Sequence, residues 1–254
     1  MLNWLKSFRK NQPLPAVPAG QCVYAVGDVH GRLDLLDELL SRMQSDFSTY
    51  PGFTGTLVFL GDYVDRGPDS RGVLERLRSL SLPGFDVVCL AGNHEEMMGL
   101  FLEDADAGAD WLRAGGVQTL RSYGIPVHVD SEPTELRDRL LDVMDRSERD
   151  FLRSLGSWYD AGDYMFAHAG IRPGRVYNQQ EDADLMWIRE PFLSSRRDHG
   201  KVVVHGHSIN YEPEFFPNAD RPRRIGIDTG AFRHGVLTCL ALVGTEHRLI
   251  QASA

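Results

Sequence analysis

Three short motifs in the first hundred residues each place metal-binding side chains beside a glycine. They are Gly27-Asp28-Val29-His30-Gly31, Gly61-Asp62-Tyr63-Val64-Asp65-Arg66-Gly67 and Gly92-Asn93-His94-Glu95. Two later histidine motifs have a similar form, Ala167-His168-Ala169-Gly170 and His205-Gly206-His207. Glycine lets the backbone approach a ligand closely, and mixed carboxylate and imidazole ligands suit manganese, iron or zinc better than calcium. The motifs therefore predict a metal site, for which manganese is the first expectation.

The candidate ligands are too numerous for a single catalytic ion. A catalytic site keeps open positions, whereas two ions that share a bridging carboxylate would use the whole set. That set comprises Asp28, His30, Asp62, Asn93, His168 and one or both of His205 and His207. If the strand persists, its alternation sends residues 205 and 207 to the same face, so the spacing leaves the choice between them open. We therefore predict a dinuclear centre.

The charge balance limits what this centre can bind. The formal net charge of the chain is -9, so no bulk positive field exists to hold a nucleic-acid backbone, and stable DNA binding is not expected. Two divalent ions would nevertheless make the pocket locally positive. Phosphate is the natural anion for such a pocket, and the guanidinium groups of Arg66 and Arg189 are suited to its oxygens.

The motifs follow segments that are typical of buried strands. Apolar runs at 22–26, 57–60 and 87–90 precede the first three motifs, and helical periodicity follows each run. The motifs are separated by roughly 30 residues, the length of one βαβ unit, so they should meet at the carboxyl edge of a parallel sheet. Later strands are expected at 164–167, 201–204, 224–227 and 236–243, in a second, mixed or antiparallel sheet. The segment 103–159 between these parts should form a helical cap or insert.

Domain organisation and location follow from composition. Residues 1–18 form a basic, proline-rich segment that we interpret as a flexible arm, and residues 19–254 form a single catalytic domain. No apolar run approaches the roughly 20 residues of a membrane span, and the first thirty residues lack a signal-peptide block. Three cysteines in apolar runs are interpreted as buried thiols in a reducing compartment. A cytoplasmic location is therefore expected, while the oligomeric state is left open.

The motifs GDVHG, GDYVDRG and GNHE, followed by the His168 strand end and Gly206-His207, resemble the phosphoprotein phosphatase family of dinuclear metallophosphoesterases. The form is similar to its short bacterial and phage lambda type serine/threonine phosphatases, and the resemblance covers residues 23–243. It implies the calcineurin-like α/β fold, with two packed mixed sheets flanked by helices. It also implies one ion on Asp28, His30 and Asp62 and a second on Asp62, Asn93, His168 and His207, which favours His207 over His205.

The same resemblance implies the catalytic roles. His94 matches the general acid and Asp65 its orienting partner, while Arg66 and Arg189 match the residues that clamp phosphate, with Asn93 and His94 also at the substrate. Independently, two metal ions can lower the pKa of a bridging water toward about 7 and supply hydroxide for direct attack on phosphorus. His94 could then protonate the departing oxygen. We therefore predict a metal-dependent phosphomonoesterase, with a phosphorylated serine/threonine protein as its expected substrate.

Two other functions share these motifs. Symmetrical diadenosine tetraphosphate hydrolases resemble the chain in the same residues, and hydrolysis of nucleotide caps on RNA belongs to the same alternative. The segment 103–159 and the loop 211–224 must then set specificity, where Trp111, Tyr123, Tyr211 and Phe215 could either stack on a base or pack in the core or at its rim. A non-catalytic phosphoprotein-binding module is disfavoured because every matched catalytic position is present. The chain has His168-Ala169-Gly170 where eukaryotic members have His-Gly-Gly, and it lacks their longer C-terminal loop, which weakens the protein-substrate prediction most.

Overall fold

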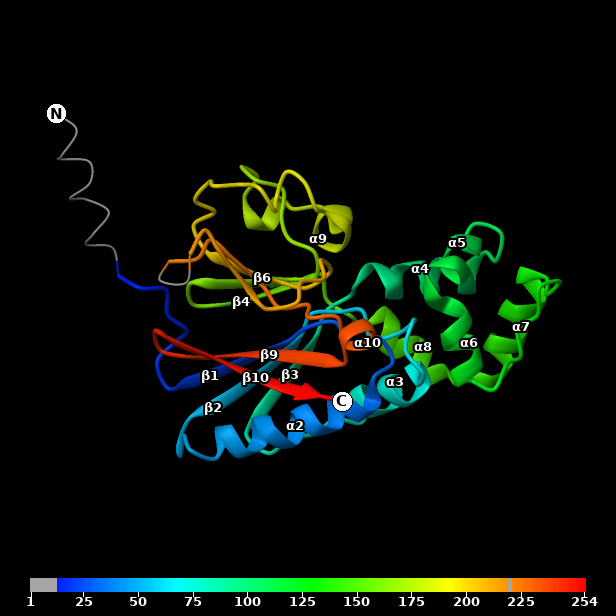
Figure 1. Cartoon of the computed structure of the whole chain (residues 1–254), viewed down its shortest axis with the longest axis horizontal. Helices are drawn as coiled ribbons and strands as arrows, with labels where there is room; N and C mark the ends of the chain where they lie inside the picture. The colour runs from blue at the N-terminus through cyan, green and yellow to red at the C-terminus, as the bar shows by residue number, and fades with distance from the viewer. Residues whose placement is uncertain (1–12, 219–220) are drawn as a thin grey trace.

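The computed structural model describes residues 13–218 and 221–254, which fold around two five-stranded sheets (Figure 1). In the first sheet the strand order is β10-β9-β1-β2-β3, with β1, β2 and β3 parallel and β9 antiparallel to both β1 and β10. Its strands are β1 (Gln21–Val26), β2 (Thr54–Phe59), β3 (Phe85–Cys89), β9 (Val236–Val243) and β10 (Glu246–Ser253). The three parallel strands are those that the apolar runs predicted.

The second sheet has the order β4-β5-β6-β8-β7. Strands β5, β6 and β8 are parallel, and the two edge strands pair antiparallel to them. The strands are β4 (Trp158–Ala161), β5 (Tyr164–Ala167), β6 (Val202–His205), β7 (Glu214–Phe216) and β8 (Arg224–Gly226). The predicted strand 236–243 is real, but the expectation that it joins this second sheet is wrong. It lies beside β1, because its buried apolar residues on both faces suit a central position between two layers.

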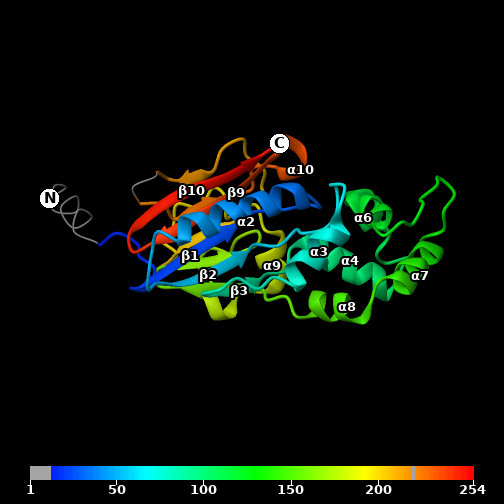
Figure 2. The same ribbon diagram turned by 90° about the horizontal axis from the view of Figure 1, so that it is seen from below.

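Side chains of β1 alternate between two cores. Cys22, Tyr24 and Val26 pack in a core with the buried face of helix α2 (Leu33–Phe47). Val23 and Ala25 point the other way and pack in a core with residues of the second sheet such as Phe166 and Val204. Figure 2 shows α2 on the outer face of the first sheet, so this sheet forms the middle layer of the molecule. The two packed mixed sheets flanked by helices are therefore confirmed.

The remaining helices gather mainly in a lobe at one end of the sheets (Figures 1 and 2). We call the helices from Asn93 to Arg153 the helical lobe; it contains most of the insert predicted at 103–159. Its members are α4 (Asn93–Glu103), α5 (Ala109–Trp111), the π-helical turn η2 (Leu112–Gly116), α6 (Val117–Ser122), α7 (Pro133–Val143) and α8 (Arg146–Arg153). The other helices are α3 (Ser70–Arg78), η3 (Tyr177–Gln179), α9 (Asp182–Trp187) and α10 (Ala231–His234).

The start of the described chain contacts both sheets. Val17 is buried, its N–H donates to the Gly244 carbonyl at 3.0 Å, and the Ala16 N–H donates to Asp163 Oδ2 at 3.0 Å. Most of the predicted arm, residues 1–12, lies outside the described residues, so the arm and its boundary stay predictions. Across residues 13–218 and 221–254, no helix is long and apolar enough to cross a membrane. The three cysteines are free thiols; Cys22 and Cys239 are buried as expected, whereas Cys89 is only partly buried.

Candidate active site

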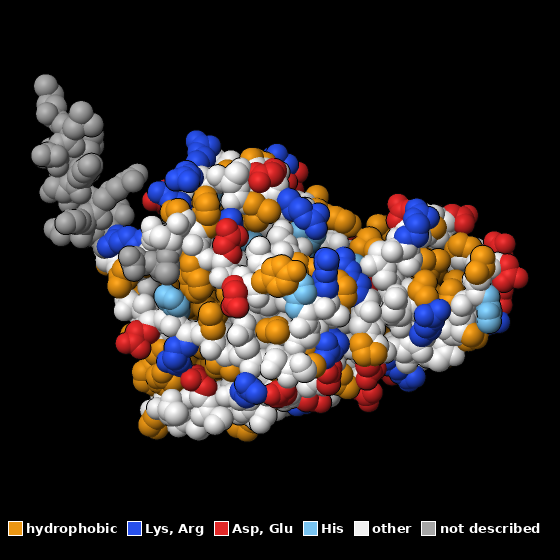
Figure 3. All heavy atoms as spheres, viewed as in Figure 1, with side chains coloured by type: hydrophobic (Ala, Val, Ile, Leu, Met, Phe, Trp, Pro, Cys, Tyr) orange, Lys and Arg blue, Asp and Glu red, His pale blue; other side chains and the backbone are white. Residues whose placement is uncertain are grey.

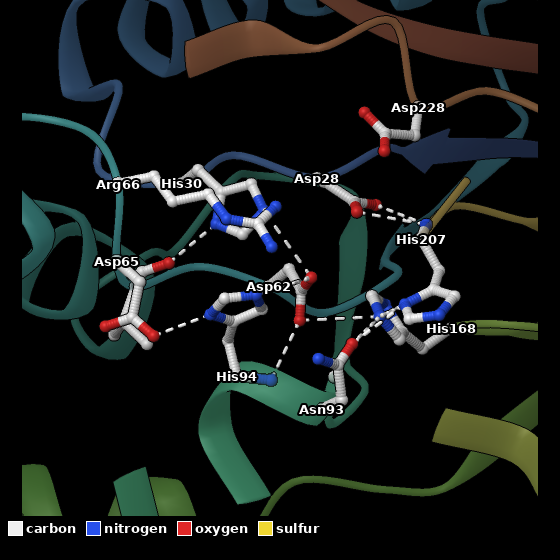
Figure 4. Close-up of polar contacts among 12 residues, drawn as sticks. Asp28, His30, Asp62, Asp65, Arg66, Asn93, His94, His168, His207 and Asp228 are labelled. Atoms are coloured by element: carbon white, nitrogen blue, oxygen red, sulfur yellow. Dashed lines mark hydrogen bonds and ion pairs between the residues drawn. The ribbon is translucent and has the colours of Figure 1, made fainter. Parts of the chain in front are cut away.

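The motif side chains meet where the carboxyl ends of the parallel strands of both sheets face each other (Figure 4). They come from the loops after β1 and β2, the first turn of α4, and the loops after β5 and β6. All of them are buried although they are polar: Asp28, His30, Asp62, Asp65, Asn93, His94, His168 and His207. The structure thus brings together the predicted metal-ligating residues and the predicted acid pair.

The turns that carry these side chains have unusual backbone conformations. His30, Asp62 and His207 have φ values of 44°, 53° and 61°, a left-handed region that costs non-glycine residues of order 1–3 kcal/mol. Two glycines allow the close approach. A Cβ atom on Gly92 would lie 2.2 Å from Asp62 Oδ1, and one on Gly206 would lie 1.9 Å from Asp28 Oδ1. At these two positions the close packing of a turn against a carboxylate requires glycine.

A first group of atoms that could bind a metal ion includes His30 Nε2 and Asp62 Oδ2. His30 Nδ1 donates to the Val64 carbonyl at 2.8 Å, which leaves Nε2 as the unprotonated nitrogen. That nitrogen lies 3.5 Å from Asp62 Oδ2. Burial lowers the pKa of His30 to about 3, so its imidazole is neutral and suited to bind a cation.

A second group of atoms that could bind a metal ion surrounds His168 Nε2. This atom lies 3.0 Å from Asn93 Oδ1, 3.2 Å from His207 Nδ1 and 3.4 Å from Asp62 Oδ1. Its ring is oriented by Nδ1, which donates to the Leu60 carbonyl at 3.0 Å. Burial lowers the pKa of His168, and it lowers that of His207 to about 3. Several lone pairs therefore converge with few protons between them, an arrangement that a divalent cation would stabilise.

The Asp62 carboxylate spans both groups, with one oxygen toward each. This geometry fits a bridging ligand between two ions. Asp28 lies at the same centre, where its carboxylate accepts the His207 N–H at 3.0 Å and 3.2 Å. Burial, together with the neighbouring carboxylates of Asp228 and Asp62, raises the pKa of Asp28 well above its ordinary value. A cluster of buried acids of this kind requires positive charge, so the donor set fits a pair of divalent ions.

His205 lies outside both groups. Its ring packs against Phe192, with ring centroids 5.1 Å apart, and its Nδ1 contacts the Gly206 carbonyl at 3.0 Å. Strand β6 ends at His205, and the positive φ of His207 turns that side chain toward Asn93. The strand alternation that left the two histidines equivalent in the sequence therefore does not extend to residue 207.

His94 and Asp65 form a buried pair beside the first group. His94 Nδ1 donates to Asp65 Oδ2 at 2.6 Å, and its Nε2 lies 3.9 Å from Asp62 Oδ2. Burial lowers the pKa of His94, but the carboxylates of Asp62 and Asp65 outweigh it, so the net shift is upward. His94 is within reach of the first group, and its Nδ1 is held by Asp65 while its Nε2 faces the centre. The ring can therefore offer a proton from Nε2.

The two arginines occupy different places at the centre. Arg66 Nη1 donates to His30 Nε2 at 2.8 Å, and its guanidinium lies 5.0 Å from the centre of the Phe232 ring. Arg189 is exposed just after α9, close enough for its charge to lower the pKa of His168 and His207. Figure 3 shows basic side chains over the junction of the sheets and the helical lobe. Arg66 therefore lies against the first group, and the charge of Arg189 acts on the histidines of the second.

The four aromatic residues considered for base stacking differ in how far they are buried. Trp111 and Tyr123 are buried in the helical lobe, where the indole N–H donates to Asp65 and the phenol donates to Glu148. Phe215 is half-buried and packs against His247. Tyr211 is 83% exposed and stacks on His234, with ring centroids 4.5 Å apart. Base stacking by Trp111 or Tyr123 is therefore excluded, and their core alternative is correct.

Two acids at the centre have roles that the motifs did not predict. Asp228, two residues after β8, is buried beside Asp28, and its pKa is raised to about 6 by burial. Glu95 accepts the N–H groups of Asp62, Tyr63 and Gly92 at 2.8, 2.7 and 3.0 Å. An acid that follows an apolar strand was the available signal for Asp228. For Glu95 the signal was its place at the third position of a helix, where capping glutamates occur.

Replacing Glu95 by glutamine should destabilise the loop that carries Asp62. The amide nitrogen would replace one of the oxygens that accept buried N–H groups and leave those donors without a partner. We expect the free energy of unfolding to fall by about 1–3 kcal/mol, measured by urea denaturation. The matched control is Glu103→Gln in the exposed last turn of the same helix, and equal stability of the two variants would contradict this interpretation of Glu95.

The chain belongs to the calcineurin-like phosphoesterase family, which matches residues 23–232. It is 39% identical over 225 residues to serine/threonine-protein phosphatase 2 of Escherichia coli, covering 85% of this chain and 90% of that protein. It is 29% identical to serine/threonine-protein phosphatase 1 of Salmonella typhimurium, with 85% and 89% covered. It is also 25% identical to an asymmetrical bis(5'-nucleosyl)-tetraphosphatase of Bacillus thuringiensis, with 85% and 88% covered.

Solved structures support the fold. A putative diadenosine tetraphosphatase superposes with a TM-score of 0.61 at 23% identity, covering 94% of this chain and 99% of that one. A cold-active protein-tyrosine phosphatase of a Shewanella species superposes with a TM-score of 0.57 at 19% identity, covering 94% and 83%. Together with the family, the site defines a metal-dependent hydrolase of phosphoesters.

Proposed function

We propose that the protein is a serine/threonine protein phosphatase. The observation that carries the proposal is its 39% identity, over most of both chains, to a protein named as such. Relatives named as phosphatases and as dinucleoside tetraphosphatases both match 85% of the chain, so the family alone does not separate the substrates. The surface beside the centre supports the choice.

An open groove of about 740 Å³ runs from Arg66 along the start of α2. Among the described residues, its lining includes one aromatic side chain, Phe232. Both the Arg66 guanidinium and the His30 ring already contact that ring, at 5.0 Å and 5.2 Å between centres. The groove therefore offers a nucleobase little aromatic surface to stack on, whereas an extended peptide needs none. The groove thus favours a phosphorylated protein chain.

We further propose that two Mn²⁺ ions are held by Asp28, His30 and Asp62 and by Asp62, Asn93, His168 and His207. Mixed oxygen and neutral imidazole donors fit Mn²⁺, although Fe and Zn share this preference. When bound, two such ions activate water at neutral pH and neutralise phosphoryl oxygens. We also propose that the protein works in the cytoplasm, where its three free thiols would stay reduced.

The residues of the chain supply the remaining steps. Arg66 and Arg189 would bind the non-bridging phosphoryl oxygens, and Arg66 would exchange its contact with His30 for the substrate. Asn93 and His94 lie at the start of α4, facing the same space. His94 would donate its Nε2 proton to the serine or threonine oxygen as the phosphorus–oxygen bond breaks, with Asp65 stabilising the imidazolium.

Hydrolysis of dinucleoside polyphosphates is the second candidate, and Tyr211 favours it. The ring of Tyr211 lies against His234 and is largely exposed, so it could stack on a base. The N–H of the preceding residue, Asn210, donates to the Asp228 carbonyl at 3.0 Å, which holds this segment close to the metal-binding residues. Capped RNA ends belong to the same alternative.

The two candidates predict opposite substrate preferences. With Mn²⁺ present, we expect kcat/KM for a phosphoserine peptide to exceed that for diadenosine tetraphosphate by at least about ten-fold, a difference of roughly 1.4 kcal/mol in transition-state stabilisation. Phosphate release measures the first and nucleotide chromatography the second. Tyr211→Ser should leave peptide turnover unchanged. Faster dinucleotide cleavage that this substitution abolishes would instead establish the second candidate.

A further inference from the structure

The helical lobe contributes two hydrogen-bond donors to the carboxylate of Asp65. The indole N–H of Trp111 donates to Oδ2 at 2.8 Å and to Oδ1 at 3.0 Å. The hydroxyl of Thr119 donates to Oδ1 at 2.6 Å, and its oxygen also accepts the Asp65 N–H at 2.9 Å. His94 Nδ1 donates to Oδ2 at 2.6 Å. Each carboxylate oxygen of Asp65 therefore accepts two hydrogen bonds. Oδ1 accepts from Trp111 and Thr119, and Oδ2 accepts from Trp111 and His94.

The two lobe donors are themselves held rigidly. Trp111 and Thr119 are fully buried, and the indole packs on the Phe101 ring with centroids 4.8 Å apart. A Cβ atom on Gly116 would lie 2.4 Å from Cδ2 of the Trp111 indole, so the lack of a side chain on Gly116 lets the backbone pack directly against the ring. Gly116 ends the segment η2, in which Gly115 has a φ of 134° and kinks the chain between the two flanking helical turns. This packing fixes the direction of the indole N–H.

We propose that Trp111 and Thr119 are positioning residues that fix Asp65 and thereby aim His94 at the leaving group. Without them, the Asp65 carboxylate could rotate about its side-chain bonds, and His94 would lose its fixed direction. The helical lobe then completes the acid half of the active site. This inference rests on the proposed role of His94 as proton donor in the proposed function.

The proposal makes a chemical prediction that a purely structural role does not. In the reaction the phosphorus–oxygen bond breaks, the leaving oxygen takes the proton of His94 Nε2, and the oxygen of water ends on phosphate. A serine alkoxide is strongly basic and needs that proton, whereas p-nitrophenolate leaves readily without it. If His94 is no longer held in a fixed orientation, hydrolysis of a phosphoserine peptide should therefore slow far more than hydrolysis of p-nitrophenyl phosphate.

The test uses Trp111→Phe, which keeps the packed ring, and Thr119→Val, which keeps the shape. With Mn²⁺ bound, we expect kcat on the peptide to fall about ten-fold in each variant, while kcat on p-nitrophenyl phosphate falls less than about two-fold and KM stays constant. Thr119→Ser keeps the hydroxyl and should restore peptide turnover. Tyr123→Phe is the matched control, since it removes a buried hydrogen bond at 2.9 Å to Glu148 in the same lobe without touching Asp65.

A second readout does not depend on activity. In metal-free protein labelled with ¹⁵N-tryptophan, the indole N–H signal of Trp111 is identified as the one that disappears in Trp111→Phe. In the unsubstituted protein this signal should be protected from solvent exchange. Thr119→Val should shift the signal, whereas Tyr123→Phe should not. Equal losses on both substrates, or losses matched by Tyr123→Phe, would overturn the proposal. The variant His94→Asn shows which of the two proposals has failed. If His94→Asn slows both substrates equally, the proposed acid role of His94 is wrong. If His94→Asn slows only the peptide while the Trp111 and Thr119 variants slow both substrates equally, only the positioning role is wrong.

Discussion

Replacement of Asp62 by asparagine is expected to empty the metal centre. The carboxylate faces both donor groups, with Oδ1 3.4 Å from His168 Nε2 and Oδ2 3.5 Å from His30 Nε2. An amide has one neutral oxygen, and its NH₂ group would face one of the two groups in place of a charged ligand. Loss of a residue that only hydrogen-bonds to a metal ligand lowers metal affinity by roughly 10- to 100-fold. Because Asp62 would itself be a ligand, we expect metal affinity to fall by more than this.

Metal content after dialysis against Mn²⁺ measures this effect directly. The unsubstituted chain should retain two ions and gain thermal stability from them, because binding to the folded state alone raises Tm. Asp62→Asn should retain fewer ions and gain little. Asp46→Asn is the control, since it alters a hydrogen-bonded acid that contacts Tyr24 and Arg248 away from the centre. Two retained ions in Asp62→Asn would disprove the bridging role.

His94→Asn is expected to behave in the opposite way, keeping the metals and losing turnover. His94 contacts Asp65 through Nδ1, and its Nε2 lies 3.9 Å from Asp62 Oδ2, where the proposed function makes it the proton donor. An asparagine of similar polarity cannot deliver a proton, so kcat on a phosphoserine peptide should fall about 10²- to 10⁴-fold. Metal content and Tm should change little by comparison with Asp62→Asn.

His205→Asn is the matched control for this substitution. His205 is as fully buried as His94, but it packs on Phe192 outside both groups of metal-binding atoms. Its replacement tests the cost of losing a buried imidazole without losing the proposed acid. Equal metal depletion in His94→Asn and Asp62→Asn would contradict the division of roles, as would equal loss of turnover in His94→Asn and His205→Asn.

The tertiary arrangement explains where sequence reasoning failed. Strand 236–243 was expected in the second sheet, yet it pairs with β1, because hydrogen bonding between strands distant in the chain leaves no local signal. Trp111 and Tyr123 could be surface or core by spacing alone, and only the packing of the helical lobe buries them. The site roles of Asp228 and Glu95 depend on neighbours that lie elsewhere in the sequence, such as Asp28 and Asp62.

The amino-acid sequence by itself determined the family, the parallel strands β1 to β3 and the residues of the metal-binding motifs. Local rules suffice for these, because a buried strand, a glycine turn and polar ligands follow one another within a few residues. The tertiary structure alone decided which atoms face each other: both oxygens of Asp62 toward the two groups, His207 Nδ1 toward Asn93, and the donors from Trp111 and Thr119 to Asp65. These contacts join segments that are distant in the chain, and their geometry depends on the packing of two sheets and a helical lobe.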